Sequence, residues 1–107
     1  MPIPLSMVAV GPLNIPMEQI AQLCRRHRVR RLSLFGSALR PDFGPTSDVD
    51  LLVEFEPGAT PRFAFFALQD EFSRVLGRTV DLNTAGFLGK RFRDGVIAEA
   101  RTLYAAA

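Results

Sequence analysis

Hydrophobic and polar positions follow two different periods along the chain, and each change of period predicts a change of secondary structure. Apolar residues recur at helical spacing in three segments, which predicts helices over 16–27, 62–77 and 90–104. Three shorter runs are rich in β-branched and apolar residues and are bounded by turn residues, which predicts strands over 30–36, 49–55 and 78–83. We therefore expect an α/β (α+β) fold with a small mixed three-stranded sheet, or a slightly larger one, flanked by helices.

Finer features of the pattern place the ends and faces of these helices. Pro16 suits a first helical turn, and Gly77 is the expected C-cap of helix 62–77. A short helix is expected near Ser37 and should end at Pro41. The stripe expected to face the core from helix 62–77 consists of Phe65, Leu68, Phe72, Val75 and Leu76. The last helix is expected to pack inward Phe92, Val96, Ala100 and Leu103.

Length and composition allow one small domain with a hydrophobic core. The chain has 107 residues, 48% of them apolar, and a formal net charge of +2, which is too small for a nucleic-acid-binding tail. Because Cys24 is the single cysteine, an internal disulfide is excluded, and a reducing cytoplasm is the expected location. No apolar run reaches the roughly 20 residues of a membrane span. We expect residues 1–15 to form a loose or partner-packed arm and 16–107 to form a single domain.

Two aspartates at the head of the most apolar strand carry the first chemical signal. Residues two apart on a strand point to the same face, so Asp48 and Asp50 should project side by side. Two carboxylates this close repel each other unless a cation lies between them. Their hard oxygen atoms suit Mg²⁺ or Mn²⁺, and a pair of such ions can hold the attacking and leaving oxygens of a phosphoryl displacement.

A Gly-Ser step before this strand supplies the complementary half of a phosphate site. Gly36 allows close approach of the backbone, and Ser37 is expected at a helix N-terminus, where N–H groups favour an anion. Asp81 lies on a separate predicted strand. If that strand neighbours 49–55, Asp81 can complete the metal site or take the proton of an attacking hydroxyl.

These residues resemble the nucleotidyltransferase superfamily typified by DNA polymerase beta, and most closely its minimal nucleotidyltransferases (MNT). The resemblance runs from about residue 31 to residue 104, and the matching positions are Gly36, Ser37, Asp48, Asp50 and Asp81. Arg40 lies where small members commonly have an arginine. The resemblance implies a palm-like fold, two Mg²⁺ ions on the three aspartates, and phosphate binding by Gly36, Ser37 and Arg40. It also implies ATP as substrate, a protein hydroxyl such as tyrosine as acceptor, and an antitoxin role beside a HEPN-domain toxin.

Simpler interpretations of the same residues stay open. Asp48 and Asp50 could be turn residues at a strand entry, Asp81 a surface residue, and Ser37 a plain N-cap. The arginine-rich segment 25–31 could bind nucleic acid, although such a run is more often the solvated end of a helix. Cys24 is expected in the core, and His27 at the surface. The aromatic segment 63–72 is expected to be half core and half interface. A protein with this fold could also neutralise a toxin by binding alone, or act as a nucleic-acid-binding accessory module.

Overall fold

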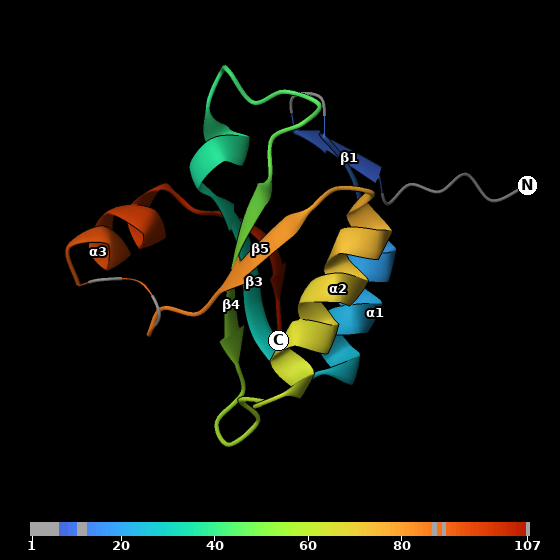
Figure 1. The fold of residues 1–107 in the computed structure, drawn as a ribbon. Coiled ribbons are helices and arrows are strands. Elements are labelled where there is room, and N and C mark those ends of the chain that lie inside the picture. The colour runs from blue at the N-terminus through green and yellow to red at the C-terminus, as the bar shows by residue number, and fades with distance from the viewer. Residues whose placement is uncertain (1–6, 11–12, 87, 89, 107) are drawn as a thin grey trace, which may run out of the picture.

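A computed structural model describes residues 7–10, 13–86, 88 and 90–106, with the side chains of 90–93 excluded. Its main sheet has four strands in the spatial order β5–β4–β3–β6 (Figure 1). The strands are β3 (Val29–Phe35), β4 (Val49–Phe55), β5 (Val80–Asn83) and β6 (Arg101–Ala105). β4 pairs antiparallel with β3 and parallel with β5, and β3 pairs antiparallel with β6. The prediction of a small mixed sheet is confirmed, and the sheet has one strand more than the three predicted.

The helices lie on both sides of this sheet. α1 (Met17–Arg26) and α2 (Ala64–Leu76) lie side by side against one face, whereas α3 (Lys90–Glu99) lies on the other side (Figure 1). The face toward α1 and α2 forms the core, because alternate strand residues such as Leu34, Leu51 and Val53 point into it. The intervening residues, Phe35 and Asp50 among them, point toward the α3 side. The strand period therefore gives this sheet one packed face and one face with a cavity.

Helix α2 confirms the predicted stripe and cap. Phe65, Leu68, Phe72 and Leu76 are buried, Val75 is half-buried against the core, and Gly77 follows them in the left-handed conformation with φ 65°. On the neighbouring helix Cys24 is fully buried, and burial raises the pKa of its thiol to about 12, against a smaller lowering by Arg25. Such a thiol stays protonated and unreactive at neutral pH, so the expected core role of Cys24 is confirmed.

The N-terminal segment differs from the loose arm expected for residues 1–15. β1 (Met7–Val10) and β2 (Leu13–Pro16) form an antiparallel pair, and Leu13 and Ile15 are buried in the core. Apolar and polar residues alternate in this short segment, which is typical of a strand. The nearby prolines argue against regular structure, so the sequence analysis did not predict one. Residues 1–6 and 11–12 lie outside the described residues.

The last predicted helix is shorter than expected and is followed by a strand. α3 ends at Glu99, and residues 101–105 pair with β3 instead of continuing the helix to residue 104. Thr102 and Tyr104 favour strand geometry, and pairing satisfies backbone groups that would otherwise form an open edge of β3. Leu103 is buried as predicted, but from a strand. Val96 and Ala100 are half-buried, and the predicted contact of Phe92 lies outside the described side chains.

Candidate active site

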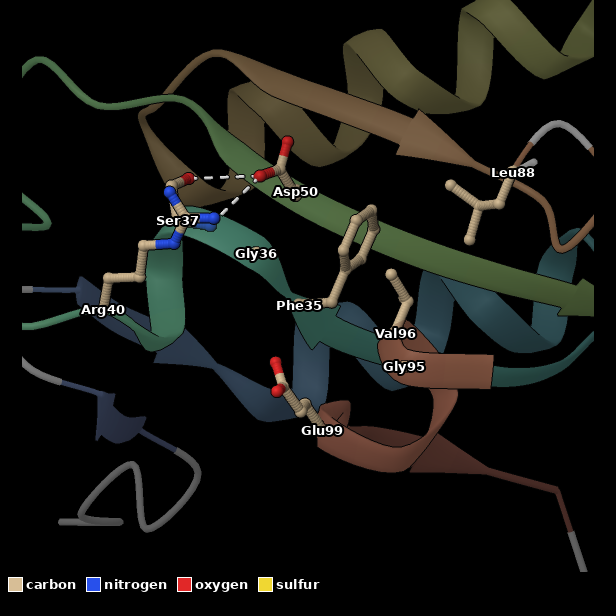
Figure 2. A pocket seen from close by; sticks show the side chains of 9 residues that line it. All are labelled: Phe35, Gly36, Ser37, Arg40, Asp50, Leu88, Gly95, Val96 and Glu99. Atoms are coloured by element: carbon tan, nitrogen blue, oxygen red, sulfur yellow. Dashed lines mark hydrogen bonds between the residues drawn. The ribbon is translucent and has the colours of Figure 1, made fainter. Parts of the chain in front are cut away.

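The Gly-Ser step and the second aspartate of the pair form one hydrogen-bonded unit. Phe35, the last residue of β3, is the register partner of Asp50 on β4, so the turn that follows β3 begins beside that carboxylate. The main-chain N–H and the hydroxyl of Ser37 both lie 3.2 Å from Oδ2 of Asp50 (Figure 2). Because both contacts reach the same oxygen, Ser37 does not engage Oδ1 of Asp50. An incoming phosphate would compete with Oδ2 for the Ser37 N–H.

Gly36 is required at this position for two independent reasons. Its φ is +64°, a left-handed conformation that side chains disfavour. A Cβ atom added there would lie 2.5 Å from Oδ2 of Asp50. Any larger residue would therefore strain the backbone and displace the carboxylate. The expected close approach at Gly36 is confirmed, although the group that approaches is a carboxylate of the chain itself.

Asp48 joins the same unit through its backbone. The Ser37 hydroxyl lies 2.7 Å from the main-chain oxygen of Asp48, and since it has one proton it donates to Asp48 or to Asp50 at any one time. Val49 is fully buried between the two aspartates, so it anchors the start of β4 in the core. The Asp48 side chain is exposed, one residue ahead of the strand. It is therefore free to reach a cation brought by a substrate.

Asp81 lies next to Asp50 across the parallel strand pair. The two residues are register partners of β4 and β5, so β5 does neighbour β4 as the sequence analysis required. Asp81 is exposed on an edge strand. Among the residues that the structure describes, no three histidine, cysteine, aspartate or glutamate side chains come together as a metal site. The three-carboxylate metal site therefore stays a prediction.

The donor set nevertheless fits magnesium held jointly with a substrate. Mg²⁺ commonly takes one or two protein carboxylates and completes its shell with water and substrate phosphate oxygens. Asp48 is exposed, and Asp50 has Oδ1 unengaged by Ser37. These two residues can supply the protein ligands, and Asp81 is placed to join them.

A cavity of about 500 Å³ opens beside this unit. Of the six predicted site residues, Gly36, Ser37, Arg40 and Asp50 line it, whereas Asp48 and Asp81 do not (Figure 2). The other lining residues were not predicted as site residues and are Phe35, Leu88, Gly95, Val96 and Glu99. Most of them come from α3 and the segment before it. Helical periodicity assigned α3 to the core, so no signal in the sequence placed it over this face of the sheet.

The loop between Ser37 and Asp48 is held by an arginine that sequence reasoning also missed. One guanidinium nitrogen of Arg78 donates to the main-chain oxygens of Gly44 and Ser47, the latter at 2.7 Å. Its guanidinium carbon lies 4.7 Å from the centre of the Phe43 ring, a cation–π arrangement. Arg78 thus fixes the backbone just before Asp48. The predicted strand began at this residue, and no motif in the sequence assigned its side chain a role.

The arginine-rich segment 25–31 does not line this cavity, and three of its five arginines are paired within the chain. Arg26, Arg28 and Arg31 lie 3.6, 4.0 and 3.8 Å from Glu71, Glu56 and Glu54 respectively. His27, expected at the surface, is half-buried, and its Nε2 lies 3.3 Å from Glu71. Intramolecular pairing lowers the positive field that a nucleic acid would require. These contacts favour the structural interpretation of the cluster.

Sequence and structure comparisons agree with this geometry. Residues 17–104 match the profile of the nucleotidyltransferase domain family. The chain belongs to the nucleotidyltransferase family. It is similar to "Putative protein adenylyltransferase MJ0435" of Methanocaldococcus jannaschii, with 34% identity over 88 residues that cover 82% of the chain and 94% of that protein. The predicted family, fold and enzyme class are therefore confirmed.

Two solved structures extend the comparison. One, described as a "putative minimal nucleotidyltransferase", has 37% identity and a TM-score of 0.67 and covers 78% of this chain and 85% of that one. The other contains a tri-AMPylated Shewanella oneidensis HEPN toxin in complex with an MNT antitoxin. It has 20% identity and a TM-score of 0.60 and covers 84% of this nucleotidyltransferase and 70% of that chain. At that identity the second comparison supports the fold alone.

Replacing Gly36 should separate backbone strain from damage to the site. Gly36→Ala and Gly77→Ala both place a side chain at almost the same positive φ, +64° and +65°, and each should lower the free energy of unfolding by about 1–2 kcal/mol. Only Gly36→Ala brings a Cβ against Asp50, whereas a Cβ at Gly77 meets nothing within 4 Å. Calorimetry with Mg-ATP should show weaker binding by ~10-fold or more for Gly36→Ala alone. Equal binding by the two variants would contradict the role assigned to Gly36.

Replacing Arg78 should loosen the loop before Asp48. Arg78→Gln removes the charged donor and the ring contact, so it should lower the free energy of unfolding by about 2 kcal/mol and weaken Mg-ATP binding. Arg78→Lys keeps the charge but not the planar group, and should fall between Arg78→Gln and wild type. Arg74→Gln, at an exposed position on α2, is the matched control and should change neither quantity. Wild-type stability and binding in Arg78→Gln would show that this contact positions nothing.

Proposed function

We propose that this nucleotidyltransferase transfers AMP from ATP to a hydroxyl group of a partner protein, a tyrosine of a HEPN-type toxin, and so acts as its antitoxin. The observation that carries the proposal is the Gly36–Ser37–Asp50 unit at the end of a cavity large enough for a nucleotide. The adenylyltransferase name of the M. jannaschii relative and the AMPylated toxin beside a related fold support the choice of AMP and of a protein acceptor.

The transfer requires that one oxygen–phosphorus bond forms as another breaks. The acceptor hydroxyl attacks the α-phosphorus of ATP, pyrophosphate leaves with the electrons of the broken bond, and the hydroxyl proton must go to a base. Asp81 is the proposed base, because it lies beside Asp50 and is exposed to an acceptor that arrives from solvent. Ser37 and Arg40 contribute donors to the phosphates, and Arg40 adds positive charge to the lining of the cavity.

Asp48 and Asp50 are the proposed magnesium ligands, with Asp81 as a further candidate. When bound there, Mg²⁺ would neutralise charge on the triphosphate and stabilise the leaving pyrophosphate. The carboxylates also need a counter-charge in any complex with a polyanion, since two negative groups at the same site as a triphosphate repel it. This requirement makes nucleotide binding depend on a divalent cation.

Exposed aromatic residues favour a second candidate function, neutralisation by binding alone. Phe63 and Phe66, at the start of α2, are 90% and 64% exposed. The same segment buries Phe65 and Phe72, as expected for its core half, and the exposed half is the proposed interface. A sequestering protein would use such a surface without any need for the transfer site.

Co-expression with a neighbouring HEPN-type protein tests the proposal. We expect a co-purifying complex in which incubation with Mg-ATP adds the mass of one or more AMP groups to tyrosines of the partner. EDTA should prevent the addition. Asp50→Asn should bind the partner but leave it unmodified, because the variant loses a metal ligand and the charge that Ser37 contacts. Asp81→Asn should keep ATP affinity and lower transfer by ~10²-fold or more.

The variants and controls separate the two candidate functions. Loss of both modification and toxin rescue with Asp50→Asn supports the enzyme, whereas rescue that persists without modification supports sequestration. Phe63→Ser with Phe66→Ser should weaken the complex but not Mg-ATP binding. Complexes that form without modification even in the wild type, at saturating Mg-ATP, would contradict the proposed transfer.

A further inference from the structure

The start of helix α2 exposes one row of side chains of mixed chemistry. Arg62, Phe66 and Asp70 follow one another at four-residue spacing, so they lie along one side of the helix. Main-chain hydrogen bonds from Phe65 to Arg62 and from Phe66 to Phe63 extend the first turn back to Arg62. All three residues of the row are exposed, and Phe63 beside them is 90% exposed. Two exposed phenylalanines on one helix mark an interaction surface.

Phe66 is held in place although it is exposed. Its ring centre lies 5.8 Å from that of Phe65, in an edge-to-face arrangement, and Phe65 is buried in the core. A ring that the core already positions loses little side-chain freedom when a second surface covers it. Rigid aromatic groups of this kind are typical of the centres of protein interfaces.

The charges on either side of Phe66 have no partner within the described chain. Arg62 lies one turn before Phe66 and Asp70 lies one turn after it, and neither side chain forms an ion pair or a hydrogen bond with another described residue. The row therefore has a positive end, an aromatic centre and a negative end.

Such a row is complementary to itself. If two copies pack with their α2 helices antiparallel and with Phe66 against Phe66, each Arg62 lies opposite the Asp70 of the other copy, because both residues are four positions from Phe66. Rows at four-residue spacing pack into each other when the helices cross at about 50°. A two-fold axis through the Phe66 contact repeats every contact, so both charge pairs form.

We infer that this exposed row of α2 is the face through which two copies of this chain associate. α2 lies on the side of the sheet opposite α3 and the cavity, so both candidate active sites stay open in the pair (Figure 1). The interface is small, because it is centred on Phe63 and Phe66 of each copy, and its dissociation constant is expected at ~10–100 µM. The inference does not depend on the transfer reaction. The second candidate function assigns the same two phenylalanines to a different protein, so the protein studied alone distinguishes the two.

Charge reversal tests the pairing. Sedimentation equilibrium of the wild-type protein alone, from ~5 to ~500 µM, should show a monomer–dimer equilibrium. Arg62→Glu places like charges opposite each other at both ends of the row and should weaken dimerisation by ~10-fold or more, and Asp70→Arg should do the same. The double variant should restore the wild-type equilibrium. An equimolar mixture of the two single variants should form a heterodimer, because each copy supplies the charge that the other lacks.

Three controls accompany this experiment. Arg101→Glu reverses an exposed arginine on β6 and should leave dimerisation unchanged. Phe66→Ser removes the central ring from both copies and should weaken dimerisation by ~10-fold or more. Calorimetry should show the same Mg-ATP affinity for every variant as for wild type, since none of these residues lines the cavity.

The outcomes are distinct from those that test the transfer reaction. A wild-type protein that stays monomeric at ~500 µM would overturn the inference and leave the exposed phenylalanines to the partner protein. A dimer that neither Phe66→Ser nor charge reversal weakens would show that the copies associate through another surface. A mixture of Arg62→Glu and Asp70→Arg that forms no heterodimer would contradict the antiparallel arrangement.

Discussion

The contact between Ser37 and Asp50 is the constraint on which the rest of the site depends. It joins the turn after β3 to the second residue of β4, and it is possible only because Gly36 has no side chain. The same serine hydroxyl reaches the backbone of Asp48. One serine thus sets the position of both aspartates before any substrate binds. Such preorganisation lowers the cost of assembling charged groups around a polyanion.

The sheet topology brings together residues that are far apart in the sequence. Antiparallel pairing of β3 and β4 places the Gly-Ser turn beside Asp50, and parallel pairing of β4 and β5 places Asp81 on its other side. α1 and α2 cover the opposite face, where the alternate residues of the same strands are buried. Packing on this face therefore fixes the strands, and the opposite face carries the Ser37–Asp50 contact and the cavity. Arg78 fixes the loop that precedes Asp48 by donating to the main-chain oxygens of Gly44 and Ser47.

Local signals in the sequence were sufficient for the family, the central strands and the Gly36–Ser37–Asp50 unit. The Gly-Ser step and the paired aspartates predicted Gly36, Ser37 and Asp50, which the structure does bring together. The sequence did not predict the strand at 101–105, because Leu103 fits a helical and a strand pattern equally well. It also did not show that α3 lies over the cavity, since Val96 and Glu99 line the same cavity as Ser37 only through tertiary packing. The contacts of Arg78 depend on a loop conformation that no periodicity encodes.

The most direct test of the account is the backbone amide resonance of Ser37 in solution NMR, because this group reports on its contact with Asp50. A non-hydrolysable ATP analogue with Mg²⁺ should shift the Ser37 amide more than the amides of Leu51–Val53 in the same strand pair. Asp50→Asn should shift the Ser37 amide in the free protein and abolish the response to the analogue. A Ser37 resonance that neither the analogue nor the substitution moves would contradict the claim that Ser37 and Asp50 form the organising unit of the nucleotide site.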